Sequence, residues 1–272
     1  MQRAPLLKAV DWVSLERLIV LSPHLDDAAL SCGGLLAATR DKVSRLVITV
    51  TAGTRSRERK GFASPTERRL EDRAAMRELD CDFVHLGFPD AIYRVSPVSG
   101  QLIYRDSRER LAAPPIDDAG HVEELYLVLR RLSQDLGNVL VLSPLGIGQH
   151  VDHAICARVA LRLFGASPNL LFYEDFPYVL RGSGAGVPDD DPRQAIARLG
   201  RAAVGRHTLA IDAEAKLSIL RHYQSQIPLL FGDDPKLAAS VRGHGTRGRA
   251  EEVYWRLGTN VRRKAGKEGV RT

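Results

Sequence analysis

Short runs of aliphatic residues alternate with longer amphipathic stretches along most of the chain. The aliphatic runs have the length and composition of buried strands, and they cover 17–22, 46–51, 82–86, 139–142 and 170–173. The stretches between them place apolar residues at helical spacing, over 27–40, 66–79, 121–136 and 150–164. Strands and helices in strict alternation predict right-handed βαβ units. We therefore expect an α/β fold with a Rossmann-like, mostly parallel sheet flanked by helices.

Three segments show neither pattern and are predicted to be long loops. Residues 92–119 combine Ser, Gly, Pro and charged residues, with room for a small hairpin. Residues 181–206 begin Arg-Gly-Ser-Gly-Ala-Gly and include three successive Asp residues, and residues 232–250 are polar and rich in Gly. Loops of this length often form lids or substrate walls, so we expect them around the active site. We assign 1–258 to a single domain and the basic segment 259–272 to a flexible tail.

Composition narrows the class of protein. The chain has 272 residues, of which 44% are hydrophobic and 26% charged, as in an ordinary soluble enzyme. The formal net charge is +6, but no nucleic-acid-binding motif accompanies it, so we expect no nucleic-acid partner. No apolar run has membrane-spanning length, and we expect no membrane partner. The three cysteines form no pair motif and the N-terminus lacks a signal-peptide core, which favours the cytoplasm, while homo-oligomer formation stays open.

Two clusters of His and Asp residues each follow a predicted strand and begin a predicted helix. The first, at 22–27, reads Ser-Pro-His-Leu-Asp-Asp. The second, at 143–153, begins Ser-Pro and ends His-Val-Asp-His. In open parallel sheets, ligands bind outside the carboxyl ends of the strands. If the two strands are near neighbours, the clusters face each other across one crevice.

These residue types suit a metal-dependent hydrolase. Imidazole and carboxylate are zinc ligands, and three protein ligands with an open position are typical of a catalytic site. A metal held in this way lowers the pKa of its water and polarises a carbonyl, and a neighbouring carboxylate can take the proton. A single Asp at a helix start would be interpreted as an N-cap. Matching clusters at two strand ends favour the metal site, without deciding which Asp binds the metal.

Both clusters resemble the paired signatures of the PIG-L/LmbE-like N-deacetylase family, zinc enzymes that remove acyl groups from amino sugars. The similarity spans most of the chain and includes Leu-Gly-Phe-Pro-Asp at 86–90. The resemblance implies one zinc per chain, although other divalent metals such as iron or cobalt suit the same ligand types. It implies three zinc ligands: His24, Asp27 and His153.

Catalytic roles follow from the same resemblance. Asp26 matches the general base, and His150 matches the imidazolium that stabilises the oxyanion. Asp152 matches the acid that orients or tunes His150. Substrate-binding residues are expected partly from the resemblance and partly from their place beside the crevice, with a solvated loop as the simpler interpretation for the pair at 174–175. They are Arg68, Asp90, Glu174, Asp175 and Tyr178.

Four positions depart from the pattern of the family. Leu25 and Ala28 stand where Pro and Glu are common, and Gly148 and Val151 stand where Tyr and Pro often occur. The implied metal ligands survive these changes. The missing Tyr removes one candidate polar contact to the reaction intermediate.

The expected activity is hydrolysis of an N-acetyl or longer N-acyl group on an amino sugar or glycosylated metabolite, a small-molecule substrate. Within the family, the motifs resemble most closely those of glycopeptide-antibiotic pseudoaglycone deacetylases. Two alternatives stay open. One is an amidase or deacylase that uses the same metal site on a thiol conjugate or a lipidated sugar. The other is a non-catalytic sugar-binding module, against which the intact ligand set with Asp26 argues.

Overall fold

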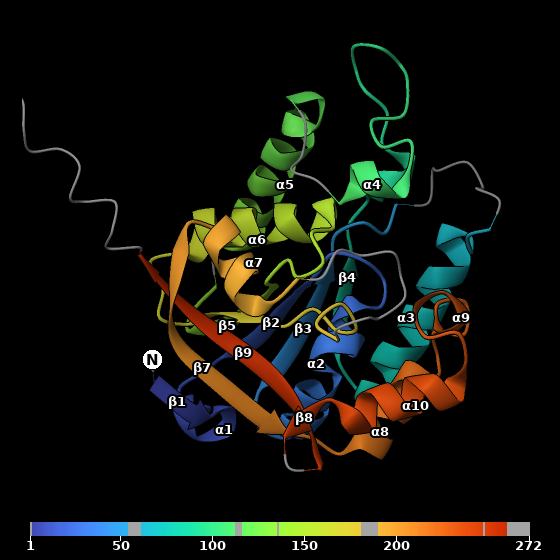
Figure 1. Cartoon of the computed structure of the whole chain (residues 1–272). Helices are drawn as coiled ribbons and strands as arrows, with labels where there is room; N and C mark the ends of the chain where they lie inside the picture. The colour runs from blue at the N-terminus through green and yellow to red at the C-terminus, as the bar shows by residue number, and fades with distance from the viewer. Residues whose placement is uncertain are drawn as a thin grey trace, which may run out of the picture.

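A mixed β-sheet runs through the centre of the protein (Figure 1). The computed structural model describes residues 2–53, 61–111, 116–134, 136–180, 190–246 and 248–259. The strands follow the order β1 Gln2–Pro5, β7 Arg201–Ala210, β9 Arg249–Thr259, β6 Leu170–Tyr173, β5 Val139–Pro144, β2 Arg17–Ser22, β3 Ser44–Thr49 and β4 Asp82–His85. The short strand β8, Gly245–Thr246, pairs with β9 outside this path.

The predicted strands form the parallel part of this sheet. β2 pairs in parallel with β3 and with β5, and the outer neighbours β4 and β6 continue the parallel arrangement. The remaining strands are absent from the sequence-based expectation. β9 runs antiparallel between β6 and β7, and β1 adds to the far edge in parallel with β7. The predicted fold class is confirmed, because most of the pairs are parallel and helices flank the sheet.

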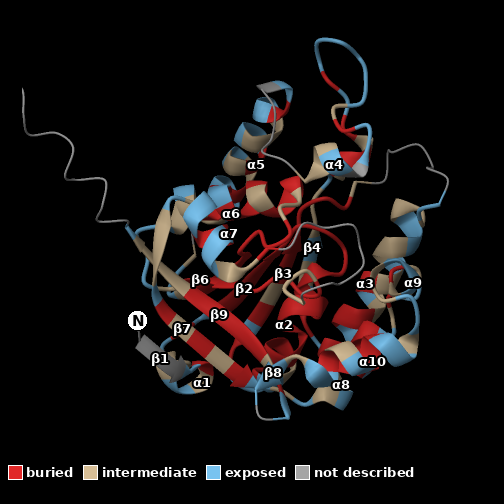
Figure 2. Ribbon diagram, viewed as in Figure 1, coloured by how far each residue is buried: buried red, intermediate tan, exposed pale blue. Residues whose placement is uncertain are grey.

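Helices cover both faces of the sheet and enclose two hydrophobic cores, so that buried residues fill the centre (Figure 2). Alternate residues of β2 point to opposite faces, and Leu18 enters one core whereas Ile19 enters the other. The first core is closed by α2 Asp27–Ala38, α3 Pro65–Leu79, α8 Ala213–Leu220 and α10 Asp234–Gly243. The second is closed by α5 Ala119–Leu132, α6 Val151–Phe164 and α7 Pro192–Arg198.

Two of the predicted loops contain regular structure instead. The described part of 181–206 holds α7 and the start of β7, and 232–250 holds α10 and β8. The polar residues that suggested loops are helix N-caps. The carboxylates of Asp191 and Asp233 accept hydrogen bonds from backbone N–H groups of the first turn that follows. Residues 181–189 lie outside the described residues.

The segment 92–119 is largely irregular, as predicted. It contains η1 Ala91–Tyr93, α4 Ser107–Arg110 and η2 Ile116–Asp118 at or near its ends. An isolated antiparallel bridge between Val95 and Leu102 forms a small hairpin. The predicted tail begins one residue too early, because Thr259 ends β9. The rest of that segment, 260–272, lies outside the described residues.

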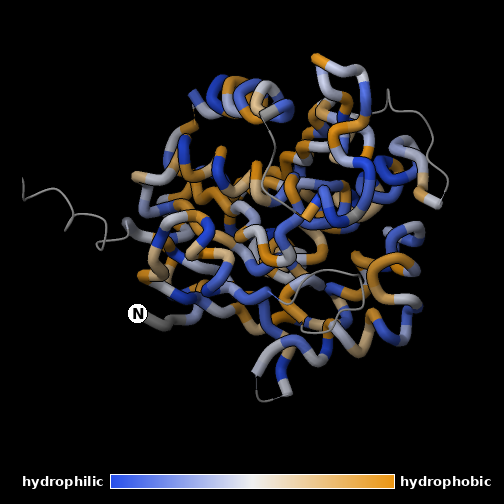
Figure 3. Tube along the Cα trace, turned by 45° about the horizontal axis from the view of Figure 1, so that its top comes forward, coloured by the Kyte–Doolittle hydropathy of each residue, from blue (hydrophilic) through white to orange (hydrophobic). Residues whose placement is uncertain are grey.

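Polar and apolar residues alternate over short distances along the chain trace (Figure 3). Within the part of the chain that the structure describes, no helix combines the length and the apolar character needed to cross a membrane.

The buried carboxylate of Glu252 joins β9 to two helices. Its oxygens accept hydrogen bonds from the backbone N–H groups of Gly34, at 2.8 Å, and Leu35, at 2.9 Å, both in α2. The Nζ atom of Lys216 in α8 donates at 2.8 Å, and the Tyr254 hydroxyl donates at the same distance. The antiparallel strand therefore stabilises the position of α2 against the sheet.

Gly34 permits this close approach. A Cβ atom added at residue 34 would meet Cγ2 of Ile211 at 2.3 Å, a separation that packed atoms do not adopt. Gly34 thus serves the packing of α2 against its neighbours. Because α2 begins at Asp27, its position also sets that of a predicted metal ligand.

We expect Glu252→Ala to lower the free energy of unfolding by about 3–5 kcal/mol, because it leaves the buried ammonium of Lys216 without its partner. Urea titration measures this loss. Glu251→Ala, on the same strand, is the matched control and should change the free energy by less than about 0.5 kcal/mol. Equal stability of the two variants would contradict the anchoring role of Glu252.

Candidate metal centre

Adjacent strand ends bring the two His/Asp clusters together. β2 and β5 are hydrogen-bonded in parallel register, so the segments that follow them leave the sheet at the same edge. The ring centroids of His24 and His150 lie 4.8 Å apart, and those of His24 and His153 lie 5.3 Å apart. The expectation that the clusters share one crevice is confirmed.

The imidazole rings of two predicted ligands, His24 and His153, lie close to one carboxylate oxygen of the third, Asp27. Oδ2 of Asp27 lies 3.1 Å from Nδ1 of His24 and 3.3 Å from Nε2 of His153. Atoms that bind one tetrahedral zinc at about 2.0–2.2 Å lie roughly 3.4 Å apart, so both separations suit neighbouring ligands. Nε2 of His153 is buried and makes no hydrogen bond with any described residue. This donor set fits a divalent metal.

A third imidazole lies within reach of the same position. Side-chain nitrogen atoms of His24, His150 and His153 lie within 4.8 Å of one another. This set differs from the predicted one only in that His150 replaces Asp27. A carboxylate brings negative charge to a buried cation and an imidazole does not, which favours Asp27 as the third ligand.

Two further carboxylates orient the imidazole rings. Oδ1 of Asp175 lies 2.6 Å from Nδ1 of His153, and Oδ2 of Asp152 lies 3.0 Å from Nε2 of His24. A carboxylate on one ring nitrogen fixes the tautomer and leaves the lone pair on the other nitrogen. In both rings that other nitrogen faces Asp27.

Asp152 contacts both His150 and His24. The resemblance implies that it orients or tunes His150; its backbone N–H donates to Nδ1 of that ring at 3.3 Å, whereas its Oδ2 lies 3.9 Å from Nδ1 of His150 and hydrogen-bonds to His24. The guanidinium of Arg94 binds the other oxygen of Asp152, and Nη2 of Arg94 lies 3.1 Å from Asp118. No motif marks Arg94 in the sequence, because it lies in a segment without periodicity.

The side chains of Glu174 and Asp175, which are predicted to contact the substrate, are buried within the protein. The side chain of Asp175 is 0% exposed and accepts hydrogen bonds from the backbone N–H groups of Gly146 and Ile147 at 2.8 and 2.9 Å. Glu174 accepts a hydrogen bond from Trp255 Nε1 at 2.8 Å, and burial raises its pKa. Asp175 therefore supports His153 from behind, and neither residue is among those that line the pocket beside the site.

Asp26 lies beside the metal donors and does not act as a helix cap. It precedes α2, but its side chain makes no capping hydrogen bond. Nη2 of Arg68 lies 3.3 Å from its Oδ1. Burial raises the pKa of Asp26 to about 6, with a further increase from Asp27 and an opposing effect of Arg68. A carboxyl group with a pKa in this range can both accept and return a proton near neutral pH.

The surroundings of His150 favour the neutral imidazole, whereas the resemblance implies an imidazolium. The backbone N–H of Asp152 donates to Nδ1 of His150 at 3.3 Å, so the ring proton is on Nε2. Burial lowers the pKa of His150 to about 3, and positive charge on His24 and His153 adds to the effect. The neutral ring can still donate a hydrogen bond from Nε2.

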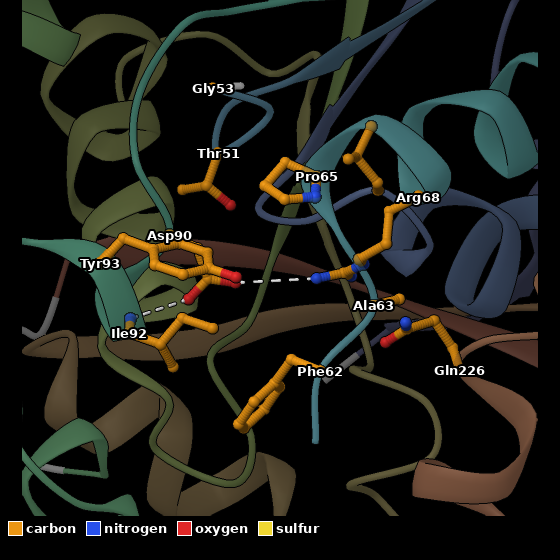
Figure 4. Close-up of a pocket in the computed structure, with 11 residues that line it drawn as sticks. Thr51, Gly53, Phe62, Ala63, Pro65, Arg68, Asp90, Ile92, Tyr93 and Gln226 are labelled. Carbon is orange, nitrogen blue, oxygen red and sulfur yellow. Dashed lines mark hydrogen bonds and ion pairs between the residues drawn. The ribbon is translucent and has the colours of Figure 1, made fainter. Parts of the chain in front are cut away.

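A pocket of about 240 Å³ opens beside these groups, and the predicted substrate residues Arg68, Asp90 and Tyr178 line it. A smaller side pocket of about 30 Å³ adjoins it (Figure 4). The side chains of Arg68 and Asp90 point toward one another there, with Nη1 and Oδ2 3.7 Å apart. Gln226 lines both pockets, and its amide donates to the Ser225 hydroxyl at 2.7 Å.

Part of the chain matches the sequence model of a known protein family. The PIG-L family, described as GlcNAc-PI de-N-acetylase, matches residues 19–164. A 2'-N-acetylparomamine deacetylase of Niallia circulans is 32% identical over 264 residues, covering 86% of this chain and 88% of that protein. A protein of the same name from Streptomyces fradiae is 35% identical over 172 residues, covering 60% of this chain. The second match spans 57% of the relative, which is less than two thirds of its length.

Solved structures agree with these matches. The zinc-inhibited form of the teicoplanin deacetylase Orf2 superposes with a TM-score of 0.74 at 27% identity, over 90% of this chain and 99% of that chain. The A40926 pseudoaglycone deacetylase Dbv21 superposes with a TM-score of 0.67 at 26% identity, over 89% of this chain and 96% of that chain.

We expect Asp175→Asn to weaken binding of a divalent metal about 10- to 100-fold, because the amide holds the His153 ring less well than the carboxylate. Competition with a chelator measures the dissociation constant. Glu174→Gln is the matched control, since its neighbouring carboxyl group contacts Trp255 and no predicted ligand. A metal affinity in Asp175→Asn equal to that of the control would rule out this support for His153.

Proposed function

The chain belongs to the PIG-L family, and on that premise we propose that it is a zinc-dependent hydrolase that removes an N-acetyl group from an amino sugar. The observation that carries this proposal is the convergence of His24, Asp27 and His153, with Asp26 beside them in a pocket. One zinc per chain would be held by Nδ1 of His24, a carboxylate oxygen of Asp27 and Nε2 of His153. When bound, a zinc ion polarises the amide carbonyl and lowers the pKa of water.

Asp26 acts as the general base and then as the general acid. Its carboxylate accepts a proton from the attacking water, whose oxygen forms a bond to the carbonyl carbon. As the C–N bond breaks, the same carboxyl group returns the proton to the leaving amine, and acetate and a free amino sugar result. The pKa of about 6 and the contact with Arg68 suit both steps.

His150 stabilises the negative oxygen that develops during attack. Its Nε2–H is available as a donor because Nδ1 accepts the backbone N–H of Asp152. A preorganised donor of this kind typically contributes a hundred- to a thousandfold in rate. It acts as a neutral imidazole, since its Nδ1 accepts a backbone N–H and its burial disfavours the charged ring.

The substrate sugar binds between Arg68, Asp90 and Tyr178. Oδ2 of Asp90 lies 3.7 Å from Nη1 of Arg68, which is too far for a strong hydrogen bond. This oxygen can therefore accept a hydrogen bond from a sugar hydroxyl. Tyr178 lines the same pocket with its ring edge-on to His153, 5.6 Å between centroids. The curated relatives are named for deacetylation of an N-acetylated amino sugar, which supports acetyl as the group removed.

We expect Asp26→Ala to lower kcat about 10²- to 10⁴-fold while retaining zinc, because it removes proton transfer and leaves the ligands in place. Acetate release from the methyl glycoside of N-acetylglucosamine gives the rate, and elemental analysis gives the metal content. Asp41→Ala, which removes an exposed carboxyl group, is the control and should keep full activity. Near-full activity of Asp26→Ala would exclude Asp26 as the base.

We expect His153→Ala to lose its zinc on dialysis, because one ligand is missing from a site that has three. His222→Ala is the control, since its imidazole contacts Glu78 at 2.6 Å outside the pocket. Elemental analysis after dialysis distinguishes the two variants. Unchanged zinc in His153→Ala would be incompatible with the ligand assignment.

A further inference from the structure

The floor and the mouth of the pocket differ in chemistry. The floor is formed by the metal donors and Asp26, which are buried. The mouth is formed by partly exposed residues from three separate segments, and they are Phe62, Arg110, Leu111, Leu229 and Leu230. All but one of these mouth residues are apolar, although sugar hydroxyls are best matched by polar side chains.

Two of the mouth residues serve neither hydrophobic core. Phe62 is 43% exposed and Leu229 is 50% exposed, and neither belongs to the described residues that pack the cores. In the short helix α9, Ile227–Leu230, the flanking residues Ile227 and Leu230 pack against the first core. Leu229 therefore projects from the other side of the helix, where it lines the pocket. Large apolar side chains that are exposed together mark binding surfaces.

The position of this helix is fixed by α3. The carboxylate of Glu71 in α3 accepts two hydrogen bonds from Ser225, at 2.7 Å from the backbone N–H and 2.6 Å from the hydroxyl. Tyr223, two residues earlier, donates to Asp72 at 2.8 Å. The segment that leads into α9 is thus held against the helix that carries Arg68, which fixes the side of the mouth formed by Leu229 and Leu230.

No described carboxylate at the mouth is placed to bind a cation. Arg110 is the one charged residue among the described residues of the mouth. The described carboxylates that line this pocket belong to Asp26, Asp27 and Asp90, which lie next to the metal donors or to Arg68. A substrate with ammonium groups on the mouth side would meet mainly hydrocarbon there and no described carboxylate.

We propose that Phe62, Leu111, Leu229 and Leu230 form an apolar shelf that binds an alkyl or aryl group carried by the amino sugar. The proposal rests on the proposed function and names the substrate class: an N-acylated amino sugar with an apolar substituent, in preference to a free polyamino sugar. The substituent is either the aglycone or a long N-acyl chain. Both have the same contact chemistry, and two arms of one experiment distinguish them.

The first arm measures binding without turnover. Titration calorimetry compares the methyl, hexyl and 6-aminohexyl glycosides of glucosamine, which carry no acyl group, on the zinc-loaded protein. We expect the hexyl glycoside to bind about tenfold more tightly than the methyl glycoside, because a fully covered methylene contributes about fourfold and the shelf covers part of the chain. The terminal ammonium of the 6-aminohexyl glycoside should reverse most of this gain.

The second arm compares kcat/KM for the methyl glycosides of N-acetylglucosamine and N-hexanoylglucosamine. Phe62→Ser and Leu229→Ser are made for both arms, and Leu70→Ser is the control because Leu70 is 58% exposed on α3 outside the pocket. Within each variant, the readout is the preference for the long compound over the short one. It is the ratio of the two affinities in the first arm and the ratio of the two kcat/KM values in the second. We expect this ratio to fall below about threefold in the two shelf variants and to persist in the control.

A preference is shelf-dependent if it is lost in Phe62→Ser and Leu229→Ser and kept in Leu70→Ser. Such a preference for the hexyl glycoside in the first arm assigns the apolar group to the aglycone. Such a preference for the N-hexanoyl compound in the second arm assigns it to the acyl chain. Absence of a shelf-dependent preference in both arms overturns the proposal. Failure of the wild-type protein to release acetate, with the hexyl preference retained, contradicts the proposed reaction and still supports the shelf.

Discussion

Parallel hydrogen bonding between β2 and β5 is the constraint on which the candidate site depends. The two strands are neighbours in the sheet although more than a hundred residues separate them in the chain. Because the strands are parallel and in register, the segments that follow them begin at the same edge of the sheet. There the rings of His24 and His153 both lie close to the carboxylate of Asp27. Because each strand is buried on both faces, a slip in this pairing would expose core residues as well as separate the ligands.

A second constraint is the burial of several ionisable groups in a small volume. Charged groups lose hydration when they are buried, and each needs a partner in compensation. Asp152 has both His24 and Arg94, and Asp175 has His153 and two backbone N–H groups. The outer carboxylates therefore stabilise the imidazoles in the orientation that a cation needs, and the cation in turn would compensate Asp27. Fold stability and metal affinity are coupled through these pairs.

The strands and helices with clear periodicity could be predicted from the sequence, and so could the meeting of the two clusters. β7 and β9 could not, since both carry charged residues along their length and neither shows an aliphatic run. At the site, spacing indicated which residues gather but not which atoms touch. Asp152 illustrates this limit: it adjoins His153 and lies two residues from His150, yet its carboxylate reaches back to His24. The role of Arg94 could not be predicted from the sequence, because an ion pair with buried carboxylates produces no periodic pattern of residues.

The antiparallel strand β9 has a consequence for the order in which the protein assembles. It is the last of the described strands in chain order, yet it lies inside the sheet between β6 and β7 and binds α2 through Glu252. A ribosome adds about 5–20 residues per second, so the parallel half of the sheet emerges well before its neighbour. Until β9 inserts, β6 presents an unpaired edge and the helix that begins at Asp27 lacks its support. The helix that carries Asp27 therefore gains its contact with Glu252 only after synthesis has passed this strand.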